Sequence, residues 1–452
     1  MSELPVTAAP EHARSARARQ RTFAAILANT AVASLTTSYL FFALTFWVYL
    51  ETRSVIATGV VGGGYMLAIA LCSMSFGTFV DRYRKLAVMR ASAALTTVAF
   101  VCAGLIYLVA GDQMRSLTSP WLWLFAVVVL AGSVVEVTRS VAMSTTLTIL
   151  IDPDRRANAN GYVGAVQGLA FIATSVFSGL SVGYLGMGLT IVCAVVLTAA
   201  GWLHLVTIRM PEEATVAESD ATGTFDVRGA WVAVAAVPGL SALILFSMFN
   251  NFTDGVYLAL LDPYGLELFS VQMWGVVFGV GATGFIVGGA LIGRFGLGGN
   301  PIRTMLLGVV ILGVICTTFA VREAAWLAIV GIWLFMLVSP AVEAAEQTVI
   351  QRVVPLPQQG RVFGLAGALE AAAAPLTAFV VAPLAEEFVI PYGRSADGSE
   401  FLAPWLGHGE ARGVALIFVI TGVVTIAVAL LAFCTPVYRR MSAEYRAVAD
   451  AE

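Results

Sequence analysis

The distribution of basic residues between long apolar stretches constrains this chain more than any other feature of its sequence. Nineteen of its 25 Lys and Arg residues fall in every second gap between those stretches, and five fall in the other gaps. The remaining one, Arg139, lies inside an apolar stretch. Short loops rich in Lys and Arg stay on the cytoplasmic side of a membrane. The pattern therefore predicts a polytopic membrane protein with both termini in the cytoplasm and an even number of spans.

The composition excludes an ordinary soluble protein. Only 12% of the residues are charged and 59% are hydrophobic, whereas soluble domains contain about 25% charged residues. The alternating pattern of a lipid-facing barrel strand is absent, so helices must cross the bilayer. The five cysteines lack the paired spacing of metal ligands. We therefore expect an all-α integral membrane fold surrounded by lipid, with no metal site, no cofactor and no nucleic acid as a partner.

The apolar stretches predict twelve transmembrane helices in two pseudo-symmetric six-helix bundles. The spans are expected at residues 22–49, 55–80, 86–110, 120–149, 161–185, 189–208, 239–261, 271–293, 301–320, 324–353, 362–388 and 413–433. The predicted parts are a cytoplasmic N-terminal tail (1–21), a first bundle (22–208), an acidic cytoplasmic linker (209–228), a second bundle (229–433) and a cytoplasmic C-terminal tail (434–452).

Two of the gaps have features of their own. Residues 230–237 precede Pro238 and Gly239, so a short helix at the membrane interface is expected there before the chain turns into the bilayer. Residues 391–412 form the largest outward gap and contain several Gly and Pro residues. That composition predicts an ordered or mobile external loop.

The two halves of the chain also repeat one another in sequence. Gly77 precedes Arg82 after the second span, and Gly289 precedes Arg294 after the eighth, each arginine being followed by an aromatic residue. Asp81 has no counterpart in the second half. Internal duplication of a six-span unit is typical of secondary transporters.

The loop after the second span carries a resemblance to a known family. Gly77, Asp81, Arg82, Arg84 and Lys85 are similar to the motif that the major facilitator superfamily has between its second and third spans. The resemblance covers nearly the whole chain through its twelve spans and central linker. It implies that Asp81 and Arg82 hold the cytoplasmic side closed through charge contacts with the neighbouring bundle. It also implies that the first, fourth, seventh and tenth spans line a central cavity.

A second, more local resemblance concerns the cargo. Residues 351–365 resemble the efflux branch that exports macrolides, tetracyclines and siderophores such as enterobactin. Two departures from the family pattern bear on proton antiport: Arg139 lacks the Gln-Gly that usually follows the family arginine, and the fifth span lacks the Gly-Pro of typical antiporters.

Ionisable residues inside the spans are candidates for function, because a charge in the bilayer core is costly unless it is paired or hydrated. Glu136 and Arg139 lie three residues apart on the fourth span, so they form either a structural ion pair or part of a site. Glu343 and Glu346 have the same spacing on the tenth span, next to Gln347. Two carboxylates this close together in a dry environment make a proton-binding site possible.

Polar residues also interrupt the seventh span, where Asn250, Asn251 and Asp254 fall in its outer half. They indicate either a solvated helix end or part of the cavity wall. Under the family resemblance these residues, the Glu136 and Arg139 pair and the tenth-span carboxylates converge on one chamber.

The sequence therefore predicts a transporter rather than an enzyme, since it has neither a nucleotide-binding motif nor a catalytic constellation. The expected function is proton-coupled export of amphipathic organic compounds, drugs or natural products, by alternating access. The expected location is a bacterial-type plasma (inner) membrane, and the expected oligomeric state is a monomer. A siderophore or lysophospholipid transporter and a ligand sensor that does not transport remain alternatives.

Overall fold

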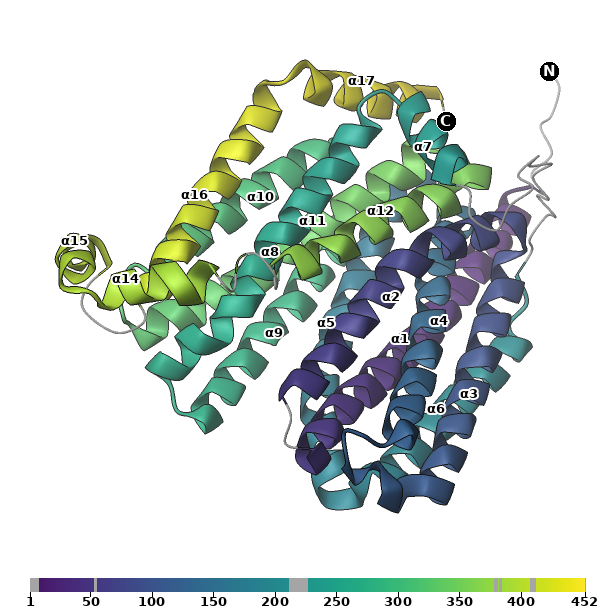
Figure 1. Ribbon diagram of the computed structural model, residues 1–452. Coiled ribbons are helices and arrows are strands. Elements are labelled where there is room, and N and C mark those ends of the chain that lie inside the picture. The colour runs from purple at the N-terminus through teal and green to yellow at the C-terminus, as the bar shows by residue number, and fades with distance from the viewer. Residues whose placement is uncertain are drawn as a thin grey trace.

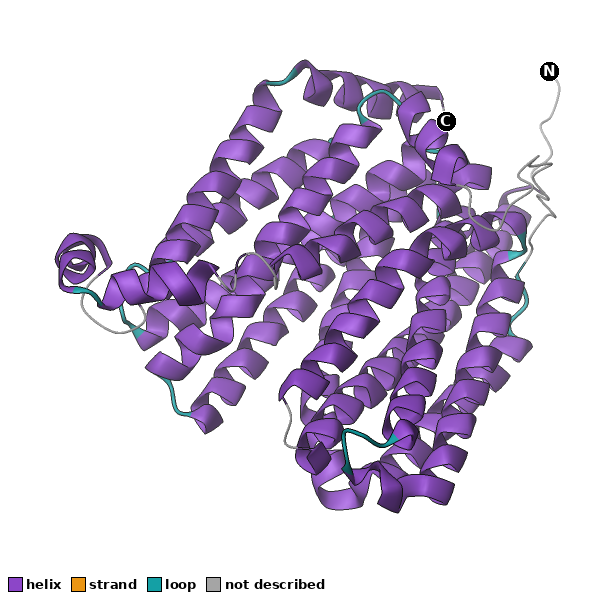
Figure 2. Cartoon of the chain, viewed as in Figure 1, coloured by secondary structure: helices purple, strands orange, loops and turns teal. Residues whose placement is uncertain are grey.

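The computed structural model describes residues 8–52, 55–210, 227–377, 381, 384–406 and 412–451. Within these ranges the regular secondary structure is entirely helical (Figure 2). Apolar side chains are compatible with strands as well as with helices, so a further cause must favour helices. Helices satisfy every backbone donor and acceptor within one segment, which an apolar surrounding requires.

The first bundle consists of six long helices. They are α1 (Ala8–Thr52), α2 (Val55–Arg82), α3 (Lys85–Ala110), α4 (Pro120–Leu150), α5 (Arg156–Leu180) and α6 (Gly186–Thr207). Short turns of 3-10 helix precede α4 and α5, and one π-helical turn joins α5 to α6. Pro120 begins α4, a position where its missing N–H costs nothing because that group has no intrahelical partner.

The second bundle adds six long helices and four short ones. They are α7 (Val227–Ala236), α8 (Leu240–Leu268), α9 (Val271–Phe295), α10 (Pro301–Thr318), α11 (Ala325–Val353), α12 (Leu356–Leu376), α14 (Ile390–Arg394), α15 (Ala396–Leu406), α16 (Arg412–Cys434) and α17 (Pro436–Ala451). Side-chain caps begin two of them: Ser270 accepts from the N–H of Met273, and Asn300 accepts from the N–H of Arg303.

The short helix expected at residues 230–237 is present as α7. It meets α8 at an angle of 111°, and the bend falls at Gly239, whose φ of 90° is readily adopted only by glycine. Residues 211–226 of the predicted linker lie outside the described residues.

The chain is an all-helical membrane protein. Nine helices in the described ranges are long and apolar enough to cross a bilayer, or ten if the bent pair α7 and α8 forms one span. The number twelve requires α5 and α12 as well, which are of similar length but carry more polar side chains, such as Asn160 and Glu370. That count stays a prediction.

The segment 391–412, predicted as an ordered or mobile external loop, is ordered over its described part, which folds into α14 and α15. Its external location stays a prediction. The buried Arg412 guanidinium explains much of the order, because it forms a 2.8 Å ion pair with Glu323 and donates to the carbonyl of Leu406. Such tertiary contacts override the turn preference of the Gly and Pro residues.

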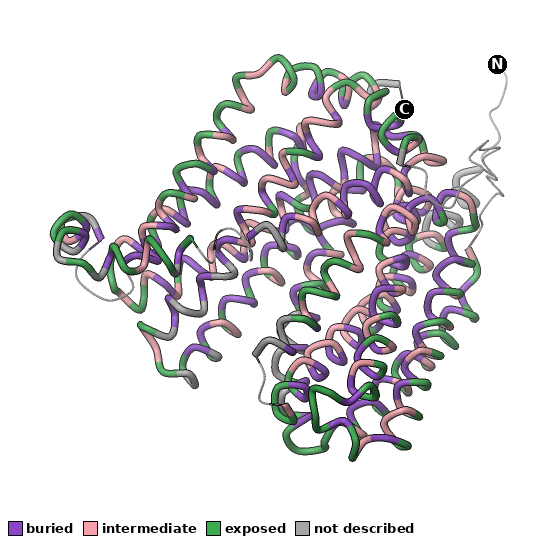
Figure 3. Tube along the Cα trace, in the orientation of Figure 1, coloured by how far each residue is buried: buried purple, intermediate pink, exposed green. Residues whose placement is uncertain are grey.

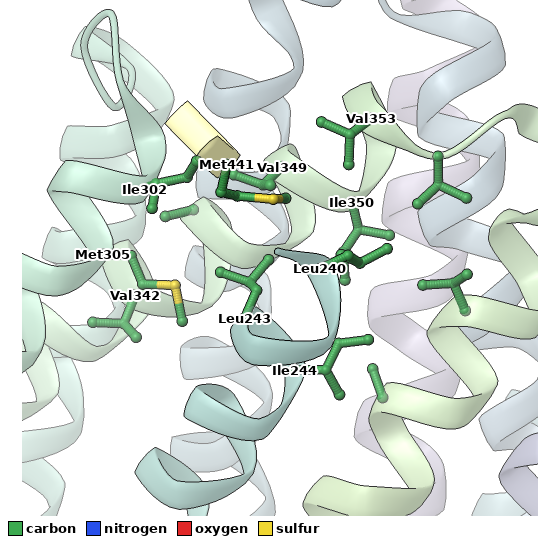
Figure 4. Close-up of a cluster of buried hydrophobic side chains, with 14 of the residues drawn as sticks. Leu240, Leu243, Ile244, Ile302, Met305, Val342, Val349, Ile350, Val353 and Met441 are labelled. Atoms are coloured by element: carbon green, nitrogen blue, oxygen red, sulfur yellow. The ribbon is translucent and has the colours of Figure 1, made fainter. Parts of the chain in front are cut away.

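Side-chain burial separates the inside of each bundle from its outer surface (Figure 3). In the second bundle, Leu240, Met305 and Ile350 belong to one closely packed apolar cluster (Figure 4). Large apolar side chains also cover the outside, including Leu108, which is 80% exposed. A soluble monomer rarely exposes so much contiguous apolar surface, whereas lipid covers it in a membrane.

The two bundles meet at one end and are separate at the other (Figure 1). Helix α2 packs against α12, and α5 packs against α9. Glycines allow both contacts: a Cβ at Gly77 would lie 2.2 Å from the carbonyl oxygen of Gly360, and one at Gly161 would lie 2.5 Å from the backbone nitrogen of Gly293. We call the end where these helix pairs touch the closed end.

Candidate functional site

A cavity of about 440 Å³ lies between the bundles. Its volume is in the range of about 300–1,000 Å³ that is usual for small-molecule sites. Helix α5 forms one wall, and α8, α9, α11 and α12 form the others. Its described lining contains four carboxylates and no basic side chain; the carboxylates belong to Asp254, Glu343, Glu346 and Glu370. Three aromatic rings complete the wall, those of Phe278, Phe285 and Phe335.

Glu343 on α11 is the most accessible of the carboxylates. Its side chain is exposed, and because it lines the cavity, this exposure is toward the cavity. The amide of Gln167 on α5 contacts it from the opposite bundle. A smaller cavity of about 90 Å³ lies on the other side of Gln167, Glu343 and Gln347, which line both spaces. Glu343 therefore stands where a cargo would touch both bundles.

Glu346 points to the same cavity but is only 6% exposed. Its side chain contacts that of Glu370 on α12, and one of its oxygens, Oε1, has no hydrogen-bond partner among the described residues. Two carboxyl groups can share a hydrogen bond only if one of them carries a proton. The sequence pairs Glu346 with Glu343, but the group in contact with it is Glu370, from the next helix.

Asp254 lies on the α8 side of the cavity together with Asn250 and Asn251. The amide nitrogen of Asn250 donates to Asp254 Oδ2 at 3.0 Å. Because a carboxylate oxygen accepts this bond, the orientation of the Asn250 amide is fixed, and its own oxygen, Oδ1, points away without a partner among the described residues. Asn251 is exposed and donates to the carbonyl of Ser247 one turn earlier.

The Glu136 and Arg139 pair does not join this cavity. The two side chains form a 3.2 Å ion pair on α4 and are 9% and 2% exposed. Neither lines the cavities described above. The two residues are three positions apart on α4 and are buried inside the first bundle. The next part of α4 does reach the smaller cavity, through Ser140 and Ser144. Of the three polar clusters expected in one chamber, only those of the seventh and tenth predicted spans, now in α8 and α11, line this cavity.

Asp81 lies at the closed end and connects the bundles. The backbone N–H groups of Gly360 and Arg361 in α12 donate to its two carboxylate oxygens at 2.6 and 2.8 Å. Arg361 Nε lies 3.4 Å from Oδ2, and the Asp81 side chain is 3% exposed. A carboxylate at the first turns of a helix also interacts favourably with the helix dipole. We call this group of contacts the Asp81 latch.

The other residues of the loop motif support the latch locally. Lys85 is buried, and its ammonium group donates to the carbonyl of Val80 at 2.7 Å. This bond gives a donor to one of the last carbonyls of α2. Gly77 allows the approach of α12, while Arg84 precedes α3 and is exposed. Arg82 is half-buried at the last position of α2.

A second polar contact at the closed end joins α5 to α11. The amide nitrogen of Asn160 donates to Thr348 Oγ1 and to Gln351 Oε1, both at 2.9 Å, and Gln351 Nε2 donates to the Ser144 carbonyl at 3.1 Å. Arg156 donates to the Gln351 carbonyl at 2.9 Å. These contacts are not evident from the sequence, because single Asn and Gln residues near helix ends carry no pattern.

The arrangement is suited to binding and not to covalent chemistry. Within the described ranges, no group of three or more His, Cys, Asp or Glu side chains is placed to hold a metal ion. The cavity instead offers carboxylates, amides and aromatic rings that can hold an amphipathic molecule or a proton. The contacts at the closed end can break and re-form without chemical change.

Comparison with known proteins is consistent with this picture. A family model described as the Major Facilitator Superfamily matches residues 26–378. No curated protein matches the sequence.

Several solved structures share the fold. A bacterial homologue of the iron transporter ferroportin, outward-facing with soaked iron, is 14% identical, with a TM-score of 0.63 over 89% of this chain and 98% of that one. The human organic anion transporter MFSD10 is also 14% identical, with a TM-score of 0.67 over 91% and 99%. The proton:xylose symporter XylE, bound to 6-bromo-6-deoxy-D-glucose, is 12% identical, with a TM-score of 0.62 over 92% and 96%.

Proposed function

The chain belongs to the major facilitator superfamily of secondary transporters, and from this premise we propose that it exports amphipathic organic compounds in exchange for protons. It is a membrane transporter and not an enzyme. The observation that carries the proposal is the cavity between the bundles, in which Asp254, Glu343, Glu346 and Glu370 face three phenylalanine rings. Acidic groups can bind either a proton or a cationic group of the cargo, and competition between the two couples their movements.

The contacts at the closed end support alternating access. The Asp81 latch and the Asn160–Gln351 contact consist of hydrogen bonds between the bundles, and Glu343 is exposed within the cavity. We assign this arrangement to a state that is shut toward the cytoplasm. Rocking of the bundles about the cavity would break these contacts and expose the cargo to the other side.

Transport in reconstituted vesicles tests the proposal. Purified protein in proteoliposomes with an internal pH dye is expected to alkalinise the lumen when an amphipathic cargo is added outside, because cargo that enters is exchanged for protons that leave. An outward proton gradient is expected to drive cargo accumulation. Protein-free vesicles are the control. Binding of cargo without any movement would instead support the ligand-sensor alternative.

The proposal also includes the orientation in a bacterial-type plasma membrane, with both termini cytoplasmic. Single cysteines replacing Tyr83 at the closed end and Asp112 at the opposite end, both exposed, report it in a chain whose five native cysteines are replaced. In intact cells an impermeant maleimide is expected to label position 112 and to spare position 83 until the membrane is opened. The reverse labelling would invert the topology.

Siderophore and lysophospholipid export remain the alternatives within the transporter class. Both cargoes are amphipathic, and a cavity of about 440 Å³ would hold only part of a larger one. They differ from a small organic cation in that they bring several acidic oxygens or a phosphate into a cavity whose described lining has no basic residue. Competition between candidate cargoes in the vesicle assay separates these alternatives.

A further inference from the structure

We propose that the cargo binds through a protonated amine with free N–H groups, seated between Asn250 and Glu346 with its apolar body against the phenylalanine wall. This inference rests on the proposed transport function, because it names the chemical class of the molecule that the cavity accepts. It begins from buried polar atoms that have no partner.

Four buried polar atoms of the described cavity lining lack a hydrogen bond: Ser247 Oγ, Asn250 Oδ1, Glu346 Oε1 and Gln347 Oε1. Glu346 and Asn250 are 6% and 7% exposed, and both line the cavity. Glu346 Oε1 and Asn250 Oδ1 have no partner among the described residues. A buried acceptor without a donor is costly, and each such group in a native protein needs an explanation, of which a ligand, an ion or a water is one.

Both atoms are acceptors when the proton of the Glu346–Glu370 contact lies on Glu370. Glu346 is then a carboxylate with no hydrogen to donate, and the Asn250 amide cannot be reversed without turning its NH₂ group away from Asp254. The missing partner must therefore donate hydrogen bonds. An anion or an ether oxygen would add further acceptors to a site that already has too many.

Charge selects among possible donors. Glu346 in its carboxylate form brings negative charge, Asp254 and Glu343 add two more carboxyl groups, and no basic side chain lines the described wall of the cavity. A sugar or an alcohol could donate hydrogen bonds but would leave this charge unbalanced. A quaternary ammonium would balance the charge but would leave the two acceptors unpaired. A primary or secondary ammonium group does both.

The apolar part of the cavity fits the rest of such a molecule. Phe278, Phe285 and Phe335 line the same space as the carboxylates, and Met336 lies among them. Aromatic rings bind a flat apolar body and attract a neighbouring cation through their faces. Recognition would thus combine one cationic head with one aromatic or aliphatic body.

A matched series of probes tests the inference on the full-length protein in detergent. The four probes share a naphthyl body and carry an ethylamine, its N-trimethyl derivative, an ethanol or an acetate group. Binding to the native state raises the melting temperature by an amount that grows with the logarithm of the probe concentration divided by its Kd. The amine is expected to stabilise the protein, with affinity at least about tenfold above that of the trimethyl form, the size expected for one hydrogen bond to a charged group.

Variants locate the effect. Asn250→Leu and Glu346→Gln are each expected to reduce the preference for the amine over its trimethyl form, while Glu267→Gln, at an exposed position of α8, should leave it unchanged. Equal binding of the amine and the trimethyl form by the unaltered protein would overturn the inference. Stronger stabilisation by the acetate probe or by Mn²⁺ would do the same.

Failure of this inference is distinguishable from failure of the proposed function. Amine binding without transport in vesicles would leave the amine site in place and remove the transport proposal. Proton-coupled transport of an uncharged or anionic compound, with no response to the amine, would support the transport proposal and overturn the amine site.

Discussion

Replacing Asp81 with asparagine is expected to open the closed end of the transporter. The carboxylate accepts from two backbone N–H groups and contacts Arg361, and it is 3% exposed. An asparagine keeps one acceptor but turns an NH₂ group toward a second donor and removes the ion pair with Arg361. Breaking a buried charged pair in this way costs about 3–5 kcal/mol, and 3 kcal/mol shifts a two-state equilibrium by more than about a hundredfold.

Distances between spin labels measure this shift. Labels at Tyr83 and Phe295, exposed residues on different bundles, should report a longer and broader distance distribution in Asp81→Asn than in the parent protein. Transport should fall, because the altered protein seldom returns to the state that is shut toward the cytoplasm. Binding of the cargo should change little, since Asp81 does not line the cavity.

A matched variant makes the result interpretable. Asp112→Asn also removes a carboxylate, but from an exposed turn at the other end of the molecule, where its contact with Arg115 is 3.3 Å long. Exposed ion pairs contribute about 0–1 kcal/mol, so this variant should behave like the parent. Unchanged distances and normal transport in Asp81→Asn would show that the latch does not hold the bundles together.

Prediction from sequence succeeded where the signal is local. Helical class follows from apolar runs of sufficient length, and the bend before α8 follows from Pro238 and Gly239. The helices at residues 391–412 could not be predicted in this way, because Arg412 meets Glu323 only after the chain has folded. Local composition carries no information about that contact.

The candidate site follows the same division. Membrane-embedded carboxylates stand out in the sequence because they are few, so Asp254, Glu343 and Glu346, which line one cavity, could be selected from it. The contacts of polar residues could not be predicted. Glu370 reaches Glu346 from a different helix, and Asp81 contacts Gly360, which is 279 residues away in the sequence. Glu136 and Arg139 have equally strong sequence signals, yet pair with each other inside one bundle.

The second large effect is expected at the contact between Glu346 and Glu370. If this pair carries the coupled proton, Glu346→Gln and Glu370→Gln should each abolish cargo-induced proton movement in proteoliposomes, because glutamine resembles a carboxylic acid that cannot release its proton. Glu267→Gln, on an exposed turn of α8, is the control for the substitution itself. Glu370→Gln should still bind cargo, since the Glu346 oxygen that faces the cargo is retained.

Two other carboxylates are rival proton sites. Glu343 and Asp254 line the same cavity, and Glu343→Gln and Asp254→Asn should weaken cargo binding more than they weaken coupling. If proton movement instead disappears only in one of these two variants, the coupled proton lies there. If it persists in all four variants, these carboxylates have structural roles and the proposal of proton exchange through them fails.

The position of Glu370 gives the pair a route to the latch. Helix α12 carries both Glu370 and the Gly360 and Arg361 backbone that Asp81 holds, separated by about 15 Å along the helix at 1.5 Å per residue. If Glu346 and Glu370 share a proton, its loss would leave two carboxylates in contact, and we predict that their repulsion moves α12 away from α11. A rigid helix transmits that displacement to its first turns, where the latch is. Raising the pH should therefore lengthen the Tyr83–Phe295 distance in the parent protein, and Glu370→Gln should remove this response while leaving the distance at low pH unchanged.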